Sequence, residues 1–156
     1  MNDLGLREGS GMPFRYHDGG RSVAGYRGDT GDCAVRAIAI ATGTPYKTVY
    51  DELHARIKAN PTLVGKRRSR GASPRNGVPM TILKAYLAER GWMWVALSGI
   101  GTGCTAHLAV GELPSGRLIA RVSKHVVAII NGELRDTHNP SRGGTRCVYG
   151  YWKETS

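Results

Sequence analysis

The chain has 156 residues, of which 40% are apolar and 22% are charged, so it is long enough to bury a core of its own and fits one globular domain. No apolar run approaches the ~20 residues that a membrane helix needs, which argues against a membrane-spanning protein. The formal net charge of +10 makes a polyanion a candidate partner, without choosing between nucleic acid, an acidic protein and an anionic surface.

Residues 1–29 are predicted to form a glycine-rich arm, and residues 30–156 the folded domain. Eight of the 22 glycines fall within the first 31 residues, where no helix or strand period is sustained. The arm lacks the continuous apolar stretch of a secretory signal, so we expect a cytoplasmic protein.

The first predicted helix covers Cys33–Thr42, within the stretch TGDCAVRAIAIATG. Ala, Val and Ile occupy nearly every side of it, which is typical of a buried helix. We expect Asp32 to cap the free N–H groups at its start and Gly43 to end it.

Two further helices follow. Thr44-Pro45 starts the second, with Thr as cap, and it runs to Asn60; the third covers Pro79–Arg90 and stops at Gly91. The second carries an apolar stripe that is expected to face the first, made of Val49, Tyr50, Leu53 and Ile57. The third is expected to turn inward the side chains of Ile82, Leu83, Tyr86 and Leu87.

A basic run lies between these helices among Gly, Ser and Pro residues, which predicts an exposed loop. Its cations are Lys66, Arg67, Arg68, Arg70 and Arg75. It is interpreted as a solvated loop, and the alternative is a contact with a polyanion.

The second half has the pattern of strands. Trp92–Leu97 is a predicted strand in which Trp92 and Trp94 share one face and pack in the core. A short helix is expected over Thr105–Leu113, after a glycine loop. Alternation at 118, 120 and 122 then predicts another strand.

His125–Ile130 continues as strand, and Asn131-Gly132 predicts a two-residue hairpin turn into Glu133–Thr137. Helices precede an antiparallel sheet, so the fold class is α+β.

Cys33 stands at the start of the first helix, where free N–H groups and the positive end of the helix dipole favour a thiolate. The same N–H groups are suited to hold the oxyanion formed when a thiolate attacks a carbonyl. The alternative is that Cys33 is a small apolar filler of the core.

Counting back from the Asn131-Gly132 turn places Asp136 on the same face as His125, one diagonal step away. A carboxylate there would orient the imidazole and leave its other nitrogen for a thiol. His138 falls on the same face and is the competing partner. Asn139 has the opposite parity and is the weaker third candidate.

The order of GDCAVRAIAIATG, KHVVAIING and ELRDT resembles that of papain-like cysteine peptidases, particularly their compact bacterial and phage members. The resemblance spans about Thr30 to Thr137. It implies a nucleophile at Cys33, a base at His125 and an orienting acid at Asp136, on a central helix packed against a small antiparallel sheet.

Papain-like enzymes usually place a Gln before the nucleophile to complete the oxyanion hole, and this chain has no Gln. Arg27, Asp29 or Thr30 would substitute for it, Thr30 being the neutral donor of the three. The backbone N–H of Cys33 acting with another loop is the alternative.

Three cysteines are few and odd in number, which favours reduced thiols over a disulfide framework. No cofactor is expected. A zinc site is the rival interpretation, with ligands drawn from Cys104, His107, His138 and Cys147. That spacing matches no known finger.

The sequence thus predicts a cysteine hydrolase that cleaves a peptide or isopeptide bond through a thioester, in a phage or bacterial setting. Two alternatives remain: a basic non-enzymatic protein that binds nucleic acid or an acidic partner, and a related acyl transferase or transamidase.

Overall fold

The computed structural model describes residues 11–27, 31–60, 73–74, 77–98 and 103–155. The cations of the basic loop, from 66 to 75, lie outside these residues, as do Asp29 and Thr30 of the predicted oxyanion site. Within the described residues, no helix has the length and apolarity needed to cross a membrane.

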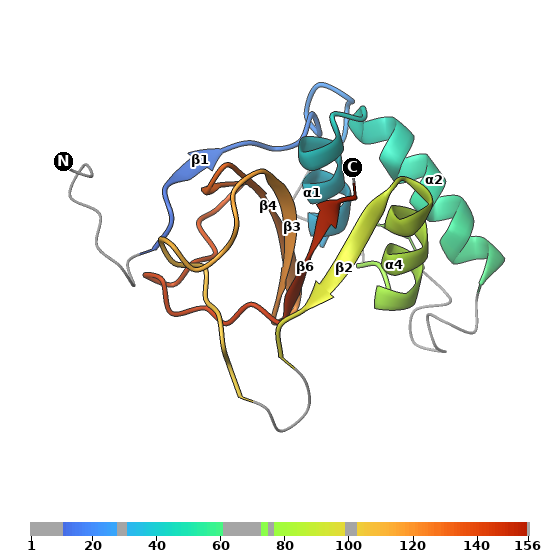
Figure 1. Cartoon of the computed structure of the whole chain (residues 1–156). Helices are drawn as coiled ribbons and strands as arrows, with labels where there is room; N and C mark the ends of the chain where they lie inside the picture. Colours follow the sequence, from blue (N-terminus) through green and yellow to red (C-terminus); the bar gives the residue numbers. More distant parts are fainter. Residues whose placement is uncertain (1–10, 28–30, 61–72, 75–76, 99–102, 156) are drawn as a thin grey trace.

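The fold is α+β, with a six-stranded sheet in the order β1-β5-β4-β3-β6-β2 (Figure 1). The strands are β1 (Phe14–Tyr16), β2 (Trp92–Ala96), β3 (Arg117–Val122), β4 (His125–Ile130), β5 (Glu133–Asp136) and β6 (Gly150–Glu154). Neighbours run antiparallel except β1 and β5, which are parallel. The sheet is therefore mixed, which corrects the antiparallel expectation.

Helix α1 (Cys33–Thr42) is buried on most sides and packs across β4 and its neighbours. Gly43 ends it in the left-handed conformation, at φ 75°, as predicted. Asp32 does not cap it through its side chain, which is a correction. That carboxylate instead binds Arg36, one turn further along the helix.

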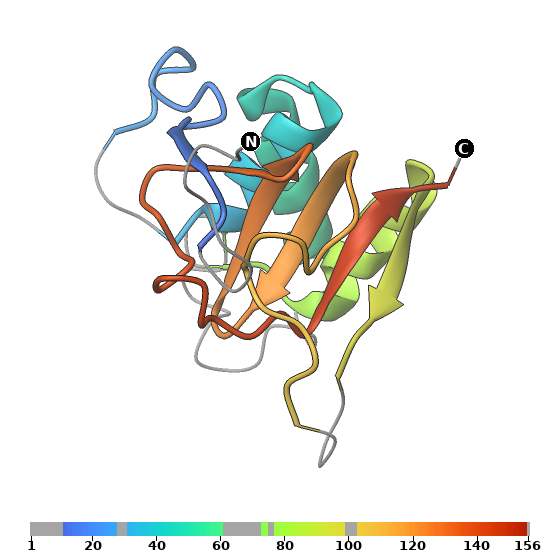
Figure 2. The ribbon, with the colours of Figure 1, turned by 60° about the vertical axis from the view of Figure 1, so that its left-hand side comes forward.

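Helices α2 (Tyr46–Ala59) and α4 (Met80–Glu89) lie with α1 on one face of the sheet (Figures 1 and 2). Pro45, rather than Thr44, is the residue that precedes α2. All eight apolar residues predicted to face inward from these two helices are buried, which confirms both stripes. They join one core with residues of β3, β4 and β6.

A second apolar cluster covers the opposite face of the sheet. Leu108, Val148 and Met12 reach it from irregular segments and pack against Leu118 and Ile129 of β3 and β4. The helix predicted over Thr105–Leu113 is wrong: this segment is irregular, because its backbone pairs with the strand-like segment around Val148 instead of with itself.

Strands β1 and β6 were not predicted. β1 lies within the segment interpreted as an arm and pairs with β5. β6 separates β3 from β2, and Trp152 on it packs against Trp94 with ring centroids 4.6 Å apart. Trp92 is buried in the helical core, so the prediction of core packing for this strand face is confirmed.

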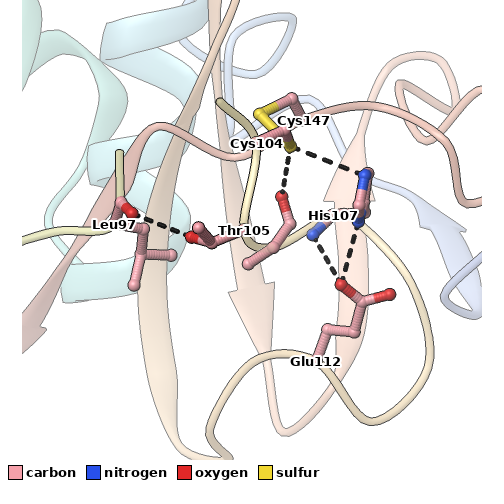
Figure 3. The surroundings of a disulfide bond; sticks show 7 residues. Leu97, Cys104, Thr105, His107, Glu112 and Cys147 are labelled. Atoms are coloured by element: carbon pink, nitrogen blue, oxygen red, sulfur yellow. Dashed lines mark hydrogen bonds and ion pairs between the residues drawn. A yellow bond between two sulfur atoms is a disulfide. The ribbon is translucent and has the colours of Figure 1, made fainter. Parts of the chain in front are cut away.

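Cys104 and Cys147 form a disulfide, with Cα atoms 5.8 Å apart (Figure 3). This corrects the expectation of reduced thiols and leaves no thiolate there for zinc. His107 lies beside the disulfide, with Nε2 3.5 Å from the Cys104 sulfur and Nδ1 3.0 Å from Glu112. The backbone brings the two cysteines together, because His107 and Cys147 form an isolated antiparallel bridge.

Candidate functional site

Cys33 is the first residue of α1, and of the three cysteines it alone carries a free thiol. It is half-buried. The helix places its sulfur against the start of β4, near the ring of His125 and the backbone N–H of Val126, both of which favour its ionised form. The start of this apolar helix lies at a polar site, which explains why the acid Asp32 and the thiol of Cys33 stand there.

The β4–β5 hairpin has the predicted register. Ile130 pairs with Glu133, Ile129 with Leu134 and Ala128 with Arg135. Asn131 in the turn has φ 49°, a left-handed conformation that Asn tolerates. The register carries Asp136 back to the level of His125, and Nε2 of His125 lies 2.6 Å from its Oδ2.

His125 therefore joins the thiol to the carboxylate. Because Nε2 faces Asp136, the other ring nitrogen, Nδ1, is left for the Cys33 sulfur. Burial alone would lower the pKa of His125, but its hydrogen bonds to Asp136 and Cys33 raise that pKa to about 9.

The pKa of Cys33 moves the opposite way. Burial opposes ionisation of the thiol, but the hydrogen bond and positive charge of His125 outweigh it, so the pKa of Cys33 lies below its ordinary value. The N–H of Val126 and the charge of Arg36 act in the same direction. The pair is thus electrostatically suited to exist as thiolate and imidazolium.

Asp136 is held from several sides. Burial opposes its charge, but His125 and Arg36 together with the backbone N–H of Thr137 lower its pKa. Its side chain is only 3% exposed. A carboxylate so placed stays ionised and has one orientation toward His125.

Arg36 is the central residue that sequence reasoning missed. Its side chain, 8% exposed, pairs with Asp136 and donates from Nε to Asp32 at 3.0 Å. Asp32 also accepts a hydrogen bond from the Tyr46 hydroxyl at 2.5 Å and faces Arg21 at 3.1 Å. The available signal was a lone Arg four residues after an Asp, in an otherwise apolar helix.

The side chain of Asp32 is thus turned away from the helix start. The N–H groups of the first turn of α1 have no side-chain cap from it, and an α-helix supplies no carbonyl to its first N–H groups. These donors belong to the turn that begins at Cys33. Of the predicted oxyanion residues, only Arg27 is described, and it is exposed.

A cleft of about 650 Å³ opens beside Cys33 and His125. Its walls come from the start of α1, from residues 77–80 leading into α4, from the β3–β4 connection and from His138. A cleft of this volume is in the range that binds a ligand the size of a small molecule.

His138 and Asn139, the other two candidates for the third member, do not take the position of Asp136 beside His125. The ring of His138 lies 5.2 Å from that of His125, centroid to centroid, and is exposed, while the side chain of Asn139 accepts the Ser141 N–H at 3.0 Å. Asp136, the favoured candidate, is the residue that hydrogen-bonds His125.

One group of possible metal ligands occurs in the described part of the chain, formed by His125, Asp136 and His138, with ligand atoms within 4.8 Å of one another. Asp136 already accepts hydrogen bonds from His125, Arg36 and Thr137. A metal would have to displace these bonds and the positive charge of Arg36. The group fits orientation of an imidazole better than ligation.

Comparison with protein families, with curated proteins and with solved structures finds no match to this chain.

Proposed function

We propose that the protein is a cysteine hydrolase of papain-like type, which cleaves a peptide or isopeptide bond through a thioester on Cys33. The observation that carries the proposal is the continuous contact from the Cys33 thiol through His125 to Asp136, at the mouth of a cleft. Asp136 is further fixed by Arg36, as an orienting carboxylate should be.

The reaction begins with the Cys33 thiolate and the His125 imidazolium. The sulfur attacks the substrate carbonyl, and the imidazolium then gives its proton to the leaving amine, which leaves a thioester on Cys33. Water then attacks the thioester with His125 as base. The acid product is released, and the free Cys33 is regenerated. A second amine in place of water would make the same site an acyl transferase.

The N-terminus of α1 supports this chemistry. The negative oxygen that forms beside the sulfur needs N–H donors, and the uncapped first turn of α1 supplies them at the positive end of the helix dipole. This arrangement takes the place of the missing Gln.

Alkylation by iodoacetamide tests the proposal. Cys33 is the one free thiol among the three cysteines, so the rate reports on it directly. We expect rapid alkylation at neutral pH, which His125→Ala slows and His54→Ala, a change on α2 away from the cleft, does not. Intact mass after mixing with a peptide ester should show the acyl group on Cys33.

Alkylation no faster than that of an unfolded cysteine, equal in wild type and His125→Ala, would contradict the proposal. It would favour instead a basic binding protein with an inert thiol. Nucleic-acid binding that weakens steeply with salt would then be the property to measure.

A further inference from the structure

The cleft beside Cys33 is positively charged. Among the residues that the structure describes, those that line it include the cations Arg121 and Lys124 and no Asp or Glu. The two acids of the site, Asp32 and Asp136, are buried and paired with Arg36, so they do not neutralise the cleft.

Backbone geometry fixes both cations next to the reacting groups. Arg121 stands directly opposite Val126, whose N–H contacts the Cys33 sulfur, and paired residues of neighbouring strands lie about 5 Å apart at Cα. Lys124 immediately precedes His125, in the connection between β3 and β4, with φ 57°.

Neither cation has a side-chain partner within the part of the chain that the structure describes. Most other described arginines do face a carboxylate: Arg15, Arg21, Arg36, Arg56, Arg90, Arg117 and Arg135. Arg121 is also half-buried at the cleft wall, with no carboxylate from the described residues facing it. A ligand carboxylate would supply the missing partner in bidentate geometry.

Two helix starts add to the positive potential. Cys33 of α1 and Met80 of α4 both line the cleft, and neither helix has an acid in its first turn to offset its dipole.

We propose that the cleft recognises a carboxylate of the substrate through Arg121 and Lys124. The substrate class is then an acidic peptide, whose carboxylate comes from an Asp or Glu side chain or from a chain terminus. This inference rests on the proposed reaction at Cys33 and names what that reaction acts on.

Two alkylating agents that differ in the presence of a carboxylate test the recognition of a carboxylate by the cleft. Iodoacetate and iodoacetamide both form a bond from carbon to the Cys33 sulfur with loss of iodide, but only iodoacetate carries a carboxylate. We expect the ratio of their rate constants, iodoacetate over iodoacetamide, to fall about tenfold in Arg121→Gln/Lys124→Gln. Lys153→Gln, an exposed change on β6 outside the cleft, should leave the ratio unchanged.

The rate with iodoacetamide alone separates the two proposals. Its retention in the double variant shows that the site is folded, and an unchanged ratio then overturns carboxylate recognition while the cysteine chemistry stands. Slow iodoacetamide alkylation in the wild type contradicts the proposed function instead, and the ratio still reports on the cleft. Arg121→Glu should depress the ratio further.

Matched peptide esters identify the source of the carboxylate. One series replaces Glu by Gln beside the ester, and the other caps the terminal carboxylate as an amide. A roughly tenfold fall in kcat/KM in the first series assigns a side chain and in the second a terminus, provided that Arg121→Gln removes the difference. Indifference to both changes overturns the proposal.

Discussion

The charge of Asp136 is the feature of the site that a single substitution isolates best. Asp136→Asn keeps the shape and hydrogen-bonding capacity of the side chain but removes the charge that stabilises the imidazolium of His125. We expect turnover of a peptide ester, or alkylation of Cys33 as its proxy, to fall by about 10³-fold or more. The free energy of unfolding should fall as well, because Arg36 loses one of its two carboxylates.

His138→Ala and Asn139→Ala are the matched controls. His138 is exposed and Asn139 bonds the local backbone, so neither orients His125 and both variants should retain most of the activity. If His138→Ala abolishes the reactivity of Cys33 and Asp136→Asn does not, the assignment of the orienting acid is wrong.

The shifted pKa values of Cys33 and His125 predict the pH profile of alkylation. The raised pKa of His125 stabilises the fold fully below pH 6.5, and that contribution is lost as pH rises to about 9. The lowered pKa of Cys33 stabilises the fold above pH 9.0, and that contribution is lost as the pH falls through the lowered pKa of the thiol. Above pH 6.5 and above the shifted pKa of Cys33, up to about pH 9, the folded protein holds one proton on His125 and the unfolded chain holds one on the thiol. The free energy of unfolding therefore does not change with pH in that range.

Reactivity is therefore the informative measurement. We expect the alkylation rate of wild-type Cys33 to reach a plateau below pH 9.0, with a second change near pH 9 as His125 loses its proton. In His125→Ala the rate should rise only toward the ordinary thiol pKa. Superimposable profiles for the two proteins would rule out the ion pair.

At the level of single residues, sequence spacing predicted what depends on local geometry. The turn at Asn131-Gly132 fixes the register, and the register fixes which side chain of β5 reaches His125. Arg36 was missed because its partner Asp136 lies 100 residues away in the chain, and no local pattern encodes that contact. Asp32 was misassigned because Arg36, one turn along the helix, and Tyr46 on α2 compete with the helix start for its carboxylate.

Among the elements, those with a strong local pattern were predicted and those defined by distant pairing were not. Helix α1 and the hairpin have clear starts and ends in sequence. The short strand β1 exists only through its parallel pairing with β5, and β6 only through β2 and β3. Residues 105–113 look helical in composition, but Gly111 at φ 83° and pairing with a distant segment hold them in an irregular path.

Arg36 joins helix α1 to strand β5, and its removal should loosen that junction. Arg36→Ala leaves Asp32 and Asp136 as neighbouring buried carboxylates without their shared counter-charge. We expect the free energy of unfolding to fall by about 3–5 kcal/mol, measured by urea denaturation.

The control is Arg56→Ala on α2, which removes an ion pair with Glu89 whose side chains are 28% and 58% exposed. That change should cost about 1 kcal/mol or less, because water screens the pair. Equal effects of the two variants would show that the Arg36 bridge adds nothing beyond a surface ion pair.

On the scale of the whole molecule, the two faces of the sheet are stabilised differently. Helices α1, α2 and α4 cover one face with a continuous apolar core, whereas irregular segments cover the other (Figure 2). The Cys104–Cys147 disulfide lies within those irregular segments and joins positions 43 residues apart. The cross-link thus holds together the layer that has the fewest regular hydrogen bonds of its own.

The disulfide should therefore support stability without taking part in the reaction. Cys104→Ser/Cys147→Ser is expected to lower the free energy of unfolding by about 2–4 kcal/mol, because the unfolded chain gains the freedom that the cross-link removes. The alkylation rate of Cys33 should be unchanged, since both cysteines lie outside the residues that line the cleft. Reductant should destabilise the wild type to the level of the double variant and leave the variant itself unaffected. A loss of Cys33 reactivity in the folded double variant would mean that the disulfide acts on the site. Arg146 would be the connection to examine, because it immediately precedes Cys147 and donates to the backbone carbonyl of Ser123, two residues before His125.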